Sequence, residues 1–191
     1  MSTSNAPFGL RPAFHPSGLD RAQALANGIA SGHTTNIFKG QPVAYDEGAG
    51  VITQVTSTEA FSGAFAGVEW TDTTGRRHVS NTWPANTAYQ TGSCVAYFYN
   101  DPNIVYEIQA DATVAQTAIG NEANFSNLTA GSTFTGLSQC TVSASLVGTT
   151  VQGQVRIVDI APYPDNAWGD AFPILRVTVA KTQFVAPSVA I

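Results

Sequence analysis

The chain has 191 residues, 43% of them hydrophobic and only 11% charged, and its formal net charge is −5. This length is enough to bury a core without metals or disulfides and is most simply one domain. Eight Lys and Arg residues against 13 Asp and Glu residues leave no basic stripe to neutralise phosphates, so we expect no nucleic-acid partner. We expect no membrane partner either, since the sequence has no basic amphipathic helix and no apolar run long enough to cross a bilayer.

Residues 1–18 predict an extended N-terminal arm. Prolines remove backbone donors and fix φ, which we expect to keep the arm out of the central sheet. The prolines concerned are Pro7, Pro12 and Pro16. The arm also displays Phe8, Leu10 and Phe14, each losing about 2 kcal/mol if left in water. Two interpretations stay open: a strap on its own core, or a clip onto another copy that uses these apolar anchors with Arg11 as the orienting charge.

Residues 19–182 predict a single β-rich domain, because alternating and β-branched runs recur between turn signals. The candidate strands are residues 51–55, 61–70, 93–99, 104–109, 140–146, 154–160 and 174–180. The turn signals lie at residues 40–42, 46–50, 72–75 and 163–166. We therefore predict an all-β fold, a small barrel or sandwich of short antiparallel strands.

Three further segments have a different character. Residues 112–119 predict one short helix, which Asp111 can cap and Gly120 can end. Residues 121–138 predict a long polar loop whose Phe and Leu side chains make it either an ordered excursion or a surface that orders on contact. Residues 183–191 predict a C-terminal tail, a second possible arm.

A hairpin is predicted over residues 97–109. Asp101, Pro102 and Asn103 suit the first three positions of a type I turn. After the turn, alternation puts Ile104, Tyr106 and Ile108 on a core face and the residues between them on the other. We therefore expect Glu107 to be solvated, and we do not read Asp101 and Glu107 as a catalytic carboxylate pair.

Residues 76–78 form the one basic cluster, Arg76-Arg77-His78. It follows a turn signal, so we expect it at the tip of a hairpin. Two interpretations remain: a solvated turn, or a docking contact of Arg76 and Arg77 with an acidic partner surface.

No motif for a nucleophile elbow, a zinc protease, a phosphate loop or a dinucleotide site occurs in the sequence. The three histidines, His15, His33 and His78, lie in separate segments without metal-ligand spacing. Cys94 and Cys140 are read as buried free thiols, with a bridge between facing strands as the alternative. We therefore predict no enzyme activity, no cofactor and no metal site.

The three tryptophans leave a second interpretation open. Trp70, Trp83 and Trp168 would suit a sugar-stacking platform if the fold brought them together. Tryptophans beside Glu, Pro and Gly more often close the ends of a β-domain or lie in interfaces. A glycan-binding or tail-associated adhesion module is therefore the alternative function, and an enzyme whose site is scattered along the chain is a third.

Four blocks carry a resemblance to a known family. The segment Asn5-Ala-Pro-Phe-Gly-Leu-Arg-Pro12 resembles the opening of capsid decoration (cement) proteins of tailed bacteriophages. Residues 101–111 are similar to that family's central block and residues 114–118 to the piece after it. Residues 156–159, 169–172 and 174–179 resemble its closing block, from which Pro173 and residues 184–191 depart.

The resemblance implies a virion structural protein on the outer surface of an icosahedral capsid, made in the host cytoplasm. The implied partners are the major capsid protein and further copies of this chain, as a homotrimer. Many modest contacts repeated by symmetry would hold such a protein on the shell, because release would require several contacts to break at once.

Overall fold

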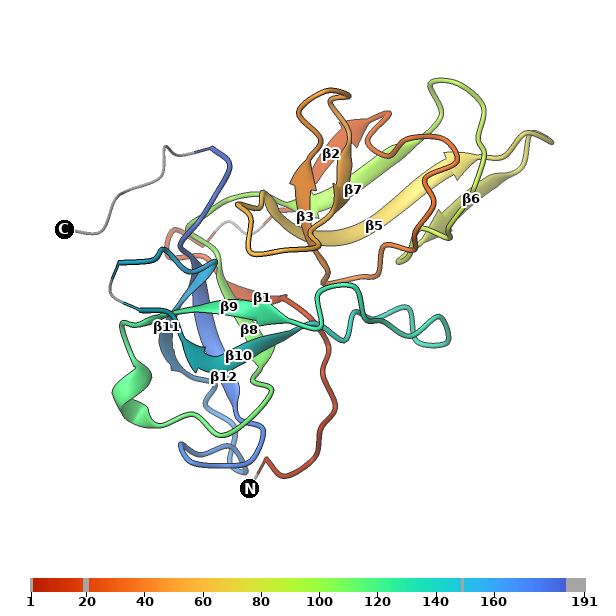
Figure 1. The fold of residues 1–191 in the computed structure, drawn as a ribbon. Helices are drawn as coiled ribbons and strands as arrows, with labels where there is room; N and C mark the ends of the chain where they lie inside the picture. The colour runs from red at the N-terminus through yellow and green to blue at the C-terminus, as the bar shows by residue number, and fades with distance from the viewer. Residues whose placement is uncertain (1, 19–20, 149, 185–191) are drawn as a thin grey trace.

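The computed structural model describes residues 2–18, 21–148 and 150–184. Its described residues form an all-β fold of two antiparallel six-stranded sheets (Figure 1). The strands are β1 (Arg11–Phe14), β2 (Gln23–Ala26), β3 (Pro42–Tyr45), β4 (Ile52–Gln54), β5 (Gly63–Thr71), β6 (Arg77–Ser80), β7 (Val95–Tyr99), β8 (Val105–Gln109), β9 (Glu122–Ser126), β10 (Thr141–Leu146), β11 (Val155–Ile160) and β12 (Ile174–Val179). The arrangement is sandwich-like and is not a closed barrel. No helix among these residues is long and apolar enough to cross a bilayer.

In the sequence, all the strands of one sheet lie between two strands of the other. Sheet A has the order β1-β8-β12-β11-β9-β10. Sheet B has the order β2-β7-β5-β3-β4, with β6 paired to β5. Every strand of sheet B therefore comes from the stretch of chain between β1 and β8, which are neighbours in sheet A.

Two hydrophobic clusters form the core, and they lie on opposite faces of sheet B. Successive residues of β3 contribute to different clusters, since Val43 belongs to one and Ala44 to the other. Ala64 and Phe65 of β5 do the same. The first cluster fills the space against sheet A, and the second packs against the loops that carry Ile37 and Trp83. Sheet B is thus buried on both faces near the start of β5.

All seven predicted strands are confirmed to within two residues at each end. The polar loop predicted over residues 121–138 is wrong in its first third, because β9 occupies Glu122–Ser126. In β9 the small and aromatic residues Ala123 and Phe125 face the core while the polar ones alternate outward. Glu and Asn favour strands weakly, which hid this alternation.

The helix predicted over residues 112–119 is reduced to a 3-10 helix, η1 (Gln116–Ala118). Asp111 does not cap it. The two carboxylate oxygens of Asp111 instead accept hydrogen bonds from the Ser126 hydroxyl at 2.8 Å and the Ala144 backbone N–H at 2.8 Å. The side chain that was expected to start a helix therefore fastens this segment to β9 and β10.

The hairpin predicted over residues 97–109 is wrong. The turn exists, and the carboxylate of Asp101 accepts hydrogen bonds from the backbone and side chain of Asn103. However, β7 belongs to sheet B and β8 to sheet A, so the two strands do not pair. The turn carries the chain from one sheet to the other.

Four glutamine side chains tie distant segments to the sheets. Gln41 donates to Gln54 Oε1 and to the Leu128 carbonyl. Gln154 accepts from the Phe125 N–H and donates to the carbonyls of residues 57 and 59. Gln109 and Gln183 act in the same way on residues 4–6 and on Tyr45, respectively. Neutral amides can donate and accept at once, which suits them to satisfying buried backbone groups.

Candidate functional site

The N-terminal arm lies on its own domain. Ser2 bonds to Asp170 and to the backbone of Phe172, and the Leu10 N–H donates to the Gly40 carbonyl at 2.7 Å. Residues 11–14 form β1, which pairs with β8 at the edge of sheet A. The expectation that prolines keep the whole arm out of the sheet is therefore wrong. Pro12 is accommodated because an edge strand has one unpaired side, and the register shifts directly after it.

The predicted clip residues divide into two kinds. Leu10 is 1% exposed and belongs to the core cluster between the sheets, so it is an anchor within its own copy. Phe8 is half-buried under the guanidinium of Arg11, 4.5 Å from its ring centroid. Phe14 is 43% exposed and lies beneath Arg176 at 5.4 Å. The arm thus presents two cation–π pairs at the surface of sheet A.

Glu107 lies between two arginines on this surface. The Arg11 Nη2 atom donates to Glu107 Oε2 at 2.7 Å, and Arg176 Nε lies 3.6 Å from Glu107 Oε1. The Tyr163 hydroxyl donates to Glu107 Oε2 at 2.7 Å. Burial alone would raise the pKa of Glu107, but the hydrogen bonds from Tyr163 and Arg11 outweigh it and hold the pKa below its usual value.

The expected solvation of Glu107 is therefore wrong, since the residue is 6% exposed. Its two cross-strand neighbours, Arg11 and Arg176, cover it from both sides. Its burial needs the pairing of β8 both with β1, almost a hundred residues earlier, and with β12. The result is a compact charged cluster that fastens the arm.

The basic cluster of residues 76–78 lies on the β5–β6 hairpin, whose turn is residues 72–75, as predicted. Arg77 bonds to Glu69, which also accepts from the Tyr97 hydroxyl at 2.9 Å. His78 bonds to Asp72 and stacks on Trp70, with ring centroids 5.0 Å apart. Arg77 and His78 are therefore engaged within the sheet, and Arg76 is exposed beside them.

A protruding hairpin, the finger, comprises residues 130–139. Its two sides are joined by hydrogen bonds from the Gln139 N–H to the Ala130 carbonyl at 2.8 Å and from the Ser132 N–H to the Leu137 carbonyl at 3.0 Å. Phe134 stands at its tip and is 97% exposed. In Figure 1 the finger is the turquoise loop that extends away from sheet A. Its sequence signal was an aromatic side chain within an uncharged, small-residue segment.

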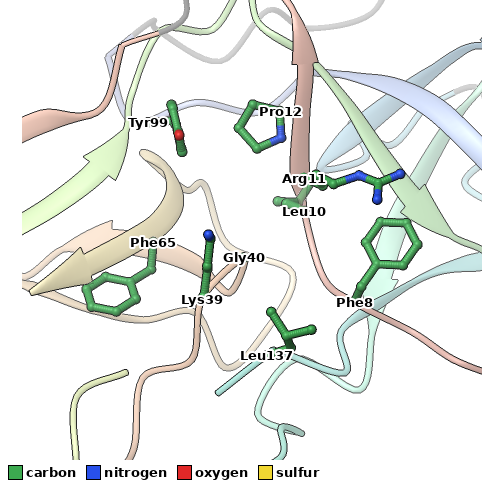
Figure 2. A pocket seen from close by; sticks show the side chains of 9 residues that line it. All are labelled: Phe8, Leu10, Arg11, Pro12, Lys39, Gly40, Phe65, Tyr99 and Leu137. Carbon is green, nitrogen blue, oxygen red and sulfur yellow. The ribbon is translucent and has the colours of Figure 1, made fainter. Parts of the chain in front are cut away.

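An open pocket of about 320 Å³ lies where the arm, the loop before β3 and the finger meet. Figure 2 shows arm residues on one side, Phe65 on the opposite side, and Lys39 and Leu137 between them. The lining residues are Phe8, Leu10, Arg11, Pro12, Lys39, Gly40, Phe65, Tyr99 and Leu137. The loop is fixed in place because Lys39 exchanges backbone hydrogen bonds with Gly136 and Ser138 of the finger, at 3.0 and 2.9 Å.

Several residues singled out in the sequence are not brought together. Trp70 and Trp83 belong to one core cluster, whereas Trp168 packs against the other, so the three do not form a platform. His15 lies 3.0 Å from Asp101, and His33 bonds to Thr35. Within residues 2–18, 21–148 and 150–184, no group of three or more His, Cys, Asp or Glu residues is placed to hold a metal ion.

The two cysteines are buried free thiols, so the interpretation of a bridge between strands is wrong. Cys94 and Cys140 belong to different core clusters, which places them on different faces of sheet B. Burial raises the pKa of both thiols and thereby suppresses the reactive thiolate form.

Comparisons with protein-family models, with curated protein sequences and with solved structures found no match to this chain.

Proposed function

We propose that this chain is a non-enzymatic virion structural protein that decorates the outer surface of an icosahedral phage capsid. In this role it binds the major capsid protein as a homo-oligomer. The resemblance in the arm, the central block and the closing block supports this role.

The observation that carries the proposal is the set of large apolar side chains exposed at separate places on the surface of the molecule. Phe134 is 97% exposed on the finger, Val79 is 76% exposed on β6, and Val151 is 56% exposed before β11. Single exposed apolar residues are ordinary, but a protein that contacts several neighbours needs such residues on separate elements, and these three lie on the finger, on β6 and before β11. On a repeating shell, contacts of this kind add together through multivalency.

Copy number tests the proposal. Particles purified by gradient sedimentation would be analysed by quantitative mass spectrometry of this chain against the shell protein. A decoration protein appears in a fixed, high ratio to the shell protein in every preparation. A tail-associated adhesion module appears in a few copies per particle, and that result, or absence from particles, contradicts the proposal.

Readdition of purified protein to stripped particles supplies the second measurement. The protein is expected to saturate a defined number of surface sites and to raise the temperature at which the shell opens. Full occupancy without any gain in shell stability would contradict the bracing role.

A further inference from the structure

Phe134 is held in solvent by a preorganised segment. Five backbone hydrogen bonds fix the finger: two join its sides, one from the Gly136 N–H to the Ser132 carbonyl closes its turn at 2.8 Å, and two exchanged with Lys39 tie it to the neighbouring loop. At its base Gly131 lies so close to the Phe38 ring that a Cβ there would stand 2.1 Å from Phe38 Cδ2. The finger therefore loses little conformational entropy when it docks, which favours binding.

The pocket beside the finger has the size and chemistry to accept an aromatic ring. Its volume of about 320 Å³ exceeds the roughly 150 Å³ in which an apolar cavity accommodates benzene. Phe8, Leu10 and Leu137 supply apolar walls, and Lys39 brings a cation to the same space. The Arg11 guanidinium points away from the pocket and lies over the Phe8 ring (Figure 2). A cation within about 6 Å of an aromatic face attracts it electrostatically.

Each copy therefore carries both halves of one contact. Phe134 does not fill the pocket of its own chain, because 97% of its surface is exposed. The finger has no charged residue between 130 and 139, so inserting it leaves no carboxylate or ammonium group of its own buried without a partner.

We propose that the finger of one copy inserts Phe134 into this pocket of a second copy and thereby joins the copies. The inference rests on the self-association that is part of the proposed function, and it names the surface responsible. Leu137 belongs to the finger and to the pocket wall, so the two halves of the contact lie next to each other on every copy. Such a contact forms a reciprocal two-fold pair, a ring where the rotation between copies closes, or an open filament where it does not.

Replacement of the ring tests the contact. Phe134→Ser removes the aromatic group from a position that contributes nothing to the folded core. Leu146→Ser is the matched control, because Leu146 is 40% exposed at the far end of β10, whose first residue, Thr141, follows the finger. Sedimentation velocity over a concentration series is expected to show a dissociation constant raised about 10- to 100-fold for Phe134→Ser, the range that burial of one Phe side chain accounts for. Leu146→Ser should self-associate like the original protein.

Cross-linking tests the occupant of the pocket. One tagged population carries Thr133→Cys, which leaves the Phe134 ring in place, and a second, differently tagged population carries Lys39→Cys. Both positions are exposed, and the native thiols are buried and do not interfere. A short bismaleimide is expected to join the two populations. A Leu146→Cys population should not be joined to the Lys39→Cys population, because Leu146 lies at the far end of β10 from the finger.

Three outcomes overturn the inference: a protein that stays monomeric at every concentration, unchanged self-association of Phe134→Ser, or no cross-link between the two populations. If Phe134→Ser stays oligomeric but no longer attaches to particles, the finger docks on the shell protein instead. If the finger joins copies but the oligomer never binds particles, the inference stands and the proposed function fails.

Discussion

Leu10 distinguishes an internal strap from an intermolecular clip. Leu10→Ala removes a side chain that is 1% exposed and packs in the cluster between the sheets. Buried Leu→Ala changes cost about 2 to 5 kcal/mol, rising with the cavity left behind. Leu10 also lines the open pocket, so its loss enlarges a space that water already enters and leaves no sealed void. We therefore expect a cost near the low end, about 2 to 3 kcal/mol.

Urea unfolding of the purified protein measures this cost. With a slope of about 2.5 kcal/mol per molar urea, the midpoint should fall by roughly 1 M for Leu10→Ala. Phe14→Ala is the matched control on the same arm, because Phe14 is 43% exposed and contributes mainly its contact with Arg176. Its cost should stay below about 1 kcal/mol. If Leu10→Ala leaves the midpoint unchanged and impairs only attachment to particles, the internal-strap reasoning is refuted.

Deleting residues 1–18 extends the same test. The deletion removes β1 and leaves Glu107 without Arg11, so we expect a larger loss of stability than Leu10→Ala causes. Thermal unfolding and attachment to particles should be measured on the same preparation. If the truncated chain melts like the full chain yet no longer stays on particles, the clip interpretation is supported. If the truncated chain still decorates particles at full occupancy, the clip interpretation is wrong.

Three further outcomes are expected. The pKa of Glu107 is lowered from 4.5 in the folded protein, so its contribution to stability is present above pH 4.5 and is lost as the pH falls through the lower folded value. The unfolding free energy of Glu107→Gln should therefore change less between pH 5 and pH 3 than that of the original protein. Identical pH profiles for the two proteins would contradict the stabilising role of the charged cluster. Cys94 and Cys140 should react with a thiol reagent only at the rate of unfolding, so rapid labelling of the native protein would count against their burial. Gln154→Ala leaves the Phe125 N–H and two carbonyls without partners and should lower the unfolding free energy by at least about 2 kcal/mol, with calorimetry as the measurement.

Local patterns in the sequence were sufficient to predict the strands whose burial alternates. β7 and β12 combine β-branched or aromatic residues with alternating burial, and both lie within two residues of the predicted bounds. β9 was missed because its exposed positions carry Glu and Asn. Local sequence predicts a helix for the 3-10 segment because the hydrogen-bond partners of Asp111, Ser126 and Ala144, lie on strands that are distant in the sequence.

The candidate site depended on contacts between distant residues, and these could not be predicted. Leu10 packs in the core of its own copy because it bonds to Gly40 and contacts the cluster against sheet B. Both partners come later in the sequence, so the local pattern around Leu10 does not indicate this packing. The burial of Glu107 needs Arg11 and Arg176, which reach it only through the pairing of three strands. The sequence shows Phe134 as an aromatic residue in a polar segment, but it does not show that the ring points into solvent.

The nesting of sheet B inside sheet A has a consequence for synthesis. About 90 residues separate Phe14 from its β8 partner Val105, and closing a loop of that length costs roughly 4 kcal/mol of chain entropy. At roughly 5 to 20 residues per second, β8 is completed about 5 to 20 seconds after β1. Throughout that interval the apolar arm has no strand to join and is open to the arms of neighbouring nascent chains. Prolines obstruct pairing between such unprotected segments, so Pro7, Pro12 and Pro16 protect the arm against aggregation until its own sheet exists.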